Sequence, residues 1–129
     1  MQLVDIDHIT IPVSDLERSR RFYVEILGLV ELPRPEYLSP GAWLAGKTGR
    51  PRINLTTRLP LRPGRGDRLE PTERHIGFLV DDYEAARTLL VSKGVRVLER
   101  QHRPDTPREL FFLDPDEHLL EIRSGPWLG

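Results

Sequence analysis

The chain has 129 residues, no cysteine and a net charge of −1 at pH 7, with 38% apolar and 30% charged residues, as in soluble globular proteins. These values exclude disulfides and thiolate metal sites, and they give no electrostatic basis for binding nucleic acid or an anionic membrane. No apolar run is long enough to span a bilayer and no secretory signal opens the chain, so we expect a cytoplasmic protein.

The first half of the chain opens with a predicted strand over residues 3–13, in which isoleucines alternate with His8 and Thr10. Ser14-Asp-Leu-Glu17 is a capping-box pattern, so a helix should begin there. Gly28 suits the left-handed residue just after a helix end. Three shorter strands, separated by proline and glycine turns, are predicted at residues 29–32, 42–45 and 52–57.

The second half repeats this plan after a segment rich in proline, glycine and arginine, residues 58–74, which we interpret as a linker. A strand over residues 75–80 leads to a second capping box, Asp81-Asp-Tyr-Glu84, and the helix should end at Gly94. Further strands are predicted at residues 95–100, 110–113 and 118–123. The sequence therefore predicts one α+β domain, residues 1–129, built from two β-α-β-β-β modules over residues 1–57 and 75–129.

The two halves also match in the places of their polar residues. His8 and His75 open the two modules, and Asn54 and Glu121 lie in the closing strands. The separation from His8 to Asn54 is 46 residues, and the separation from His75 to Glu121 is the same. An internal repeat of this kind predicts two structurally equivalent units that bring these four side chains to equivalent places.

Each predicted sheet has one face under its helix, and its other face is free to line a cavity. Because successive strand residues point to opposite faces, the apolar residues under the helix leave a set of other side chains on the cavity face. These are His8, Thr10, Trp43, Arg52, Asn54, His75, Phe111, Glu121 and Arg123. Two imidazoles and a carboxylate, from His8, His75 and Glu121, form a candidate divalent-metal triad that leaves positions open for substrate.

The remaining cavity residues suggest a class of substrate. Arginines beside a cation favour a small anionic or oxygen-rich ligand, with the aromatic side chains as walls. We therefore predict substrate contacts from Thr10, Trp43, Arg52, Phe111 and Arg123. The alternative is that Arg52 and Arg123 lie at the rim and extend into solvent.

Several motifs give the chain a resemblance to a known superfamily. They are Asp7-His-Ile-Thr10, Arg21-Phe-Tyr23, Leu27-Gly-Leu29, Gly41-Ala-Trp-Leu44, His75-Ile-Gly-Phe78, and Phe112-Leu-Asp-Pro-Asp116 leading to Leu120-Glu-Ile122. Over nearly its whole length the chain resembles the vicinal oxygen chelate superfamily, in particular its glyoxalase-like subgroup. The resemblance implies the glyoxalase/bleomycin resistance/dioxygenase fold, in which two β-α-β-β-β modules form a curved mixed sheet around a cavity.

The resemblance also implies a site. The family's metal ligands correspond to His8, His75 and Glu121, which implies one divalent ion per site (Fe, Mn, Ni, Zn or Mg). The fourth ligand position of glyoxalase-type members falls on Asn54, a departure, since an amide oxygen is a weaker ligand than a carboxylate or an imidazole. The implied activity is a glyoxalase-like lyase or isomerase reaction, with Glu121 and Asn54 as catalytic residues and a metal-stabilised enediolate or similar oxyanion.

Other functions and an assembly are also compatible with the resemblance. Two histidines and one carboxylate resemble the ligand sets of extradiol dioxygenases and of fosfomycin-resistance transferases. The transferases are disfavoured, because the tyrosine they use near the end strand corresponds to Phe111. A metal-free protein of the bleomycin-resistance type would sequester a ligand in the same cavity, but it would not need His8, His75 and Glu121 together. The family often pairs modules from different chains, so the resemblance implies a homodimer.

Overall fold

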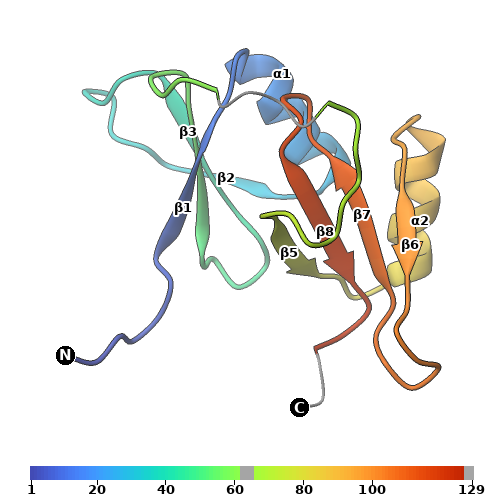
Figure 1. Ribbon diagram of the computed structural model, residues 1–129. Helices are drawn as coiled ribbons and strands as arrows, with labels where there is room; N and C mark the ends of the chain where they lie inside the picture. The colour runs from blue at the N-terminus through green and yellow to red at the C-terminus, as the bar shows by residue number, and fades with distance from the viewer. Residues whose placement is uncertain (62–65, 127–129) are drawn as a thin grey trace. The chain divides into compact units, whose positions relative to one another are not determined.

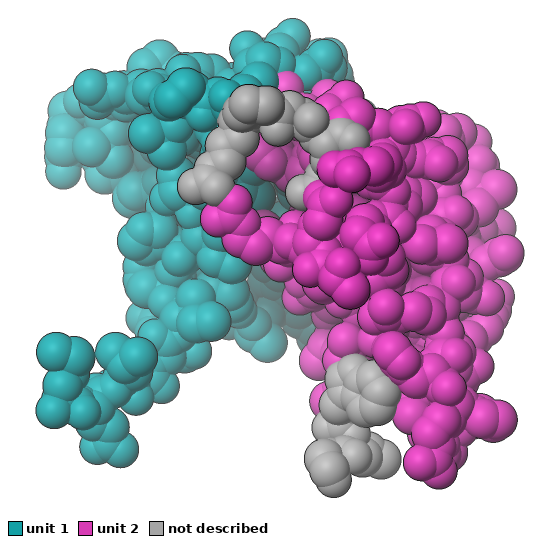
Figure 2. All heavy atoms as spheres, in the orientation of Figure 1, with its two compact units in different colours: residues 1–64 teal, residues 65–129 magenta. Residues whose placement is uncertain are grey.

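The computed structural model describes residues 1–61 and 66–126 of the chain. It divides into two compact units, Met1–Gly64 and Arg65–Gly129, coloured separately in Figure 2. Each unit has a helix between its first and second strands and a four-stranded mixed sheet (Figure 1). The predicted α+β class and the two β-α-β-β-β modules are confirmed. The described parts of the predicted linker, residues 58–61 and 66–74, contain no helix or strand.

Unit 1 has the sheet order β1-β4-β3-β2, with β1 and β4 parallel and the other neighbours antiparallel. Its elements are β1 (His8–Pro12), α1 (Leu16–Arg21), a π-helical segment (Phe22–Ile26), β2 (Val30–Leu32), β3 (Gly41–Ala45) and β4 (Arg52–Thr56). The Asp15 side chain caps α1 by accepting a hydrogen bond from the Arg18 N–H. Gly28 follows the helical region with φ of 75°, as expected for a left-handed terminating residue.

The prediction that the first strand begins at residue 3 is wrong, because β1 begins at His8. Its parallel partner β4 begins at Arg52, whose N–H donates to the Asp7 carbonyl at 3.0 Å. The preceding Pro51 has no N–H with which to extend the ladder. The alternating residues before Asp7 therefore have no strand beside them, and Leu3 and Val4 are exposed.

Unit 2 repeats the topology with the sheet order β5-β8-β7-β6, in which β5 and β8 are parallel. Its elements are β5 (Ile76–Leu79), α2 (Tyr83–Ser92), β6 (Leu98–Arg100), β7 (Glu109–Leu113) and β8 (Leu119–Arg123). Asp82 caps α2 by accepting from the Ala85 N–H, as the second capping box predicts. Residues 95–97, predicted as strand, precede β6, which begins only at Leu98.

The two units bury one face of the sheet as the alternation predicts. In unit 1, Ile53 and Leu55 are each 2% exposed, and α1 packs against β3 and β4. In unit 2, Leu120 and Ile122 are buried in the same way. The residues that the sequence predicts on the cavity face therefore lie on the opposite face of each sheet. Among the helices that the structure describes, none has the length and apolar character needed to cross a bilayer.

Candidate functional site

Strand register places the predicted site residues at equivalent points of the two sheets. In unit 1, Asn54 on β4 lies between Thr10 on β1 and Trp43 on β3. In unit 2, Glu121 on β8 occupies the same place, between Gly77 on β5 and Phe111 on β7. The equivalence of Asn54 and Glu121, predicted from their spacing to the two histidines, is confirmed by this register.

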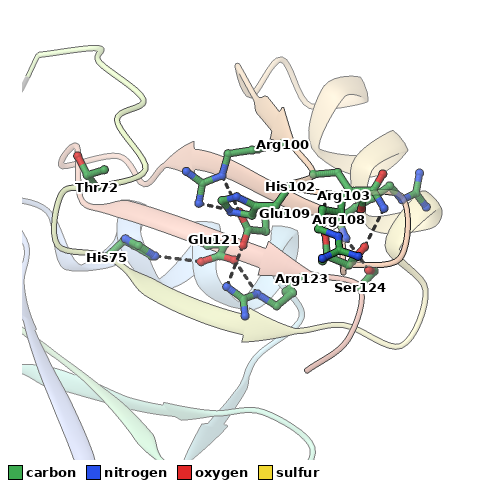
Figure 3. Close-up of polar contacts among 12 residues, drawn as sticks. Thr72, His75, Arg100, His102, Arg103, Arg108, Glu109, Glu121, Arg123 and Ser124 are labelled. Atoms are coloured by element: carbon green, nitrogen blue, oxygen red, sulfur yellow. Dashed lines mark hydrogen bonds and ion pairs between the residues drawn. The ribbon is translucent and has the colours of Figure 1, made fainter. Parts of the chain in front are cut away.

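In unit 2 the structure brings His75 and Glu121 into direct contact (Figure 3). The His75 Nε2 lies 2.9 Å from the Glu121 Oε2, and the Glu121 side chain is only 4% exposed. The His75 Nδ1 lies 2.7 Å from the Glu73 carbonyl oxygen, which can only accept, so Nδ1 carries the proton. The contact between Nε2 and the carboxylate therefore needs a second ring proton, donated to Glu121, or a cation that both groups bind.

A charged network continues from Glu121 across the sheet (Figure 3). The Arg123 Nε donates to the Glu121 Oε1 at 2.9 Å, and the Arg123 Nη2 donates to the Glu109 Oε1 at 3.0 Å. The Glu109 side chain is 1% exposed, and its Oε2 accepts from the Arg100 Nε at 2.8 Å. Two buried carboxylates are thus balanced by two guanidinium groups. Arg123, predicted as a substrate contact, has both carboxylates as partners.

Phe111 forms the wall beside this network. Its ring is fully buried and meets the His75 ring edge to face, with the centroids 5.3 Å apart. The Arg100 guanidinium carbon lies 5.2 Å from the centroid of the same Phe111 ring. Phe111 therefore packs against the His75 ring, whose orientation is also set by the contacts of Nδ1 with the Glu73 carbonyl and of Nε2 with Glu121.

In unit 1, Asp7 holds His8 in a similar way. The His8 Nδ1 lies 2.7 Å from the Asp7 Oδ2, and the Arg52 Nη2 donates to the same oxygen at 3.1 Å. The hydrogen bond from His8 and the charge of Arg52 lower the pKa of the Asp7 carboxyl. An ionised Asp7 accepts the Nδ1 proton, so the neutral His8 ring keeps its lone pair on Nε2, the nitrogen available to a metal ion.

Unit 1 also contains a recess of about 430 Å³ on the face that carries Asn54. Its polar and aromatic lining comes from Thr10, Arg34, Trp43, Asn54, Thr56 and Arg58. The Arg52 guanidinium carbon lies 4.4 Å from the Trp43 ring centroid. The Asn54 Oδ1 and the Arg52 Nε are buried, and neither has a hydrogen-bond partner among the described residues. An orphaned buried acceptor and donor mark this face as one that a polar ligand could complete.

The structure therefore gathers the predicted site residues into two groups, one in each unit. Thr10, Trp43, Arg52 and Asn54 lie in or beside the recess of unit 1, and His75, Phe111, Glu121 and Arg123 lie together in unit 2. His8 belongs to unit 1, and the other two predicted metal ligands belong to unit 2. Over residues 1–61 and 66–126 no group of three or more His, Asp or Glu side chains is placed to hold a metal ion.

Sequence reasoning missed Arg34, Arg58, Arg100 and Glu109. Strand alternation could have found Glu109, because it lies two residues before Phe111 on β7 and shares its face. Arg34 and Arg100 lie at equivalent positions. Arg34 comes two residues after Leu32, which pairs with Trp43, and Arg100 comes two residues after Leu98, which pairs with Phe111. That equivalence emerges only once the register of the short strands β2 and β6 is known.

The sequence is similar to a known family and to characterised proteins. Residues 5–122 match the model of the Glyoxalase/Bleomycin resistance protein/Dioxygenase superfamily. Glyoxylase I 4 of Arabidopsis thaliana is 29% identical over 95% of this chain and 71% of its own length. Metallothiol transferase FosB of Lysinibacillus sphaericus is 30% identical over 97% of this chain and 85% of its own length.

Solved structures agree with the fold. TnmS3, an antibiotic binding protein from Streptomyces sp. CB03234, is 26% identical with a TM-score of 0.75, covering 95% of this chain and 97% of its own. A mutant of the fosfomycin resistance protein FosX of Listeria monocytogenes, complexed with Mn(II) and 1S,2S-dihydroxypropylphosphonic acid, has a TM-score of 0.77. It covers 97% of this chain and 95% of its own, and at 22% identity it supports the fold alone.

Proposed function

Because the chain belongs to the glyoxalase/bleomycin resistance protein/dioxygenase superfamily, we propose that it is a metal-dependent enzyme acting on a small anionic substrate through adjacent oxygen atoms. The observation that carries this proposal is the contact of 2.9 Å between the His75 Nε2 and the Glu121 Oε2. With the His75 proton held on Nδ1 by a carbonyl, the contact between Nε2 and the carboxylate is completed by a second proton or by a cation, and a metal ion would take the place of that proton. Distant relatives include a glyoxylase I and a metallothiol transferase, which supports a metal enzyme.

We propose His8, His75 and Glu121 as the metal ligands. Both imidazoles have Nδ1 fixed by an oxygen acceptor, which leaves Nε2 for coordination and raises its basicity. Arg123 occupies the Glu121 Oε1 and leaves Oε2 directed toward His75. This is the second-layer arrangement that orients ligands in metal sites. A divalent ion bound there supplies Lewis-acid polarisation of substrate oxygens.

The side chains around these ligands have separate tasks in the proposed reaction, for which we favour lyase or isomerase chemistry. We assign proton transfer to Glu121, because the amide of Asn54 accepts a hydrogen bond but does not take up a proton at neutral pH. We assign to Asn54 the orientation of the substrate, since its buried Oδ1 has no partner among the described residues. Trp43 and the arginines beside it would bind the body and charge of the substrate.

A metal-free protein that sequesters a ligand is the second candidate function. The recess of about 430 Å³ in unit 1 supports it, because a pocket of that volume holds a small organic molecule. The antibiotic binding protein TnmS3 has the same fold. The two candidates differ in one requirement, since a sequestering protein needs no bound metal.

Metal loading separates these candidates. Protein prepared without a histidine tag, incubated with Mn(II), Fe(II), Co(II), Ni(II) or Zn(II) and then desalted, should retain about one ion per chain for at least one of these metals. His75→Gln should abolish retention, whereas His118→Gln changes a histidine outside the proposed set and should not. Elemental analysis measures the ratio. Failure of the wild-type protein to retain any of the five ions would contradict the proposed function and favour sequestration. Oxygen uptake by the loaded enzyme that depends on an added catechol would instead indicate extradiol-type oxygenase chemistry.

We also propose that the protein is a homodimer. Each unit has a four-stranded sheet whose polar face carries part of the proposed ligand set. In the proposed dimer, His8 and Asn54 of one protomer complete the site with His75 and Glu121 of its partner. The superfamily can assemble such faces from two chains. Sedimentation velocity at micromolar concentration should give a species of about twice the chain mass of 14.9 kDa. A metal-loaded protein that sediments as a monomer would contradict the dimer.

A further inference from the structure

One of the differences between equivalent positions of the two units points to a ligand. In unit 2, Arg100 on β6 pairs across the sheet with Glu109 on β7, and the Arg100 Nε donates to the Glu109 carboxylate at 2.8 Å. The same guanidinium lies over the Phe111 ring. Unit 2 thus provides, within the chain, a complete example of an arginine held between an aromatic ring and a carboxylate.

Unit 1 has the arginine and the aromatic ring but not the carboxylate. Arg34 follows β2 at the position equivalent to Arg100, and its guanidinium carbon lies 6.0 Å from the Trp43 ring centroid. The equivalent of Glu109 is Gly41 on β3. The Arg34 Nε is buried without a hydrogen-bond partner, and no described Asp or Glu forms an ion pair with this guanidinium.

The chain cannot supply the missing carboxylate at that position itself. A Cβ built on Gly41 would lie 2.7 Å from the Leu55 carbonyl oxygen and 3.0 Å from the Arg34 Nη2. A side chain at residue 41 would therefore collide with backbone and with the guanidinium. Arg34 lines the recess of about 430 Å³, together with Arg58, so an anion from solution has access to it.

We propose that the recess of unit 1 binds the carboxylate of a hydroxylated organic acid, which takes on Arg34 the place that Glu109 takes on Arg100. The carboxylate satisfies the buried Arg34 Nε, and Arg58 adds a second positive charge beside it. The buried Asn54 Oδ1 in the same recess lacks a donor, which a hydroxyl of the ligand provides. Trp43 and the exposed Leu59 offer apolar surface for the rest of the molecule. This inference rests on the proposed function for the role of the recess as the substrate site.

The test compares three small probes on metal-free protein, stripped with a chelator and then dialysed free of it. Mandelate carries both groups, mandelamide has the same shape without the negative charge, and phenylacetate lacks the hydroxyl. The Trp43 indole N–H resonance reports binding, and Trp127→Phe assigns it, because the chain has two tryptophans. We expect mandelate to bind at least about tenfold more tightly than mandelamide, and phenylacetate to bind with an affinity between these two.

Variants locate the binding to the proposed residue. Arg34→Gln should weaken mandelate binding at least about tenfold and should reduce its advantage over mandelamide to near zero. Arg21→Gln removes an exposed arginine from α1 of the same unit and should leave both affinities unchanged. Equal binding of mandelate and mandelamide to the wild-type protein, or no binding of mandelate, would overturn the inference without any variant having to fold.

The result is independent of the metal proposal. A protein that retains a divalent ion but binds no carboxylate in this recess refutes the inference and leaves the proposed function in place. A protein that binds mandelate through Arg34 but retains no metal refutes the metal-dependent enzyme and leaves the carboxylate site in place.

Discussion

Glu121→Gln is expected to lower the affinity for a divalent ion by at least about 100-fold. Loss of a residue that only orients a ligand typically costs about 10- to 100-fold in metal affinity, so loss of the only proposed anionic ligand should exceed that range. The amide retains the size of the carboxylate, and Arg123 keeps its second partner, Glu109, at 3.0 Å. The fold should therefore survive the change. Calorimetric titration of metal-free protein with Mn(II) or Zn(II) measures the affinity.

A matched variant, Glu36→Gln, removes an exposed carboxylate from unit 1 and should bind the ion as the wild type does. The thermal melting temperature of each variant, recorded with and without metal, separates ligand loss from unfolding. The wild type should be stabilised by the ion, and Glu121→Gln should not. Undiminished metal affinity in Glu121→Gln would show that this carboxylate is a structural member of the network and that the ligand set must be redrawn.

Glu109→Gln is expected to produce the largest loss of stability among single changes on the polar face of unit 2. Glu109 is 1% exposed and pairs with Arg100 and Arg123, whose side chains are 36% and 24% exposed. Removing the shared carboxylate charge leaves Arg100 without its carboxylate partner and leaves Arg123 with Glu121 alone. Breaking a buried ion pair typically costs 3–5 kcal/mol, and the partial exposure of the arginines places the expected loss at about 3 kcal/mol.

Urea unfolding of the metal-free protein measures this loss as a fall in the midpoint at constant slope. Glu25→Gln, which changes an exposed residue of the π-helical segment, should lower the free energy of unfolding by less than about 0.5 kcal/mol. A loss below about 1 kcal/mol for Glu109→Gln would mean that the cost of burying this charge offsets most of its attraction to the two arginines. Metal affinity should also fall, because Glu109 holds the arginine that orients Glu121.

Most of the secondary structure could be predicted because local signals and periodicity agree in this chain. The two capping boxes locate both helix starts, and Asp15 and Asp82 cap the helices as expected. The start of β1 could not be predicted, because the alternating pattern continues back to residue 3, where no neighbouring strand is present. Strand ends depend on the partner strand, which a period of two cannot reveal.

The candidate site was predictable only where residues repeat. His8 and His75, and Asn54 and Glu121, could be matched by spacing, because their strands lie in the same order in both halves. The partners of Arg123 were not predictable, since Glu109 reaches it from another strand and neither residue has a charged equivalent in unit 1. Which carboxylates neutralise an arginine depends on contacts between strands. Strand alternation places Arg52 and Arg123 on the same face, but it does not reveal that Arg123 has two carboxylate partners.

Gly41 has a wider consequence for how this chain could acquire new specificities. The two halves share a plan, but one supplies the counter-ion of its arginine from the chain, as Glu109, while the other has Gly41 at the equivalent position and would take the counter-ion from the proposed ligand. Substitutions around Arg34 can therefore change which molecules are accepted without disturbing the balanced charges that support Glu121. Ligand selectivity and the charge balance around Glu121 would then depend on different residues in different units.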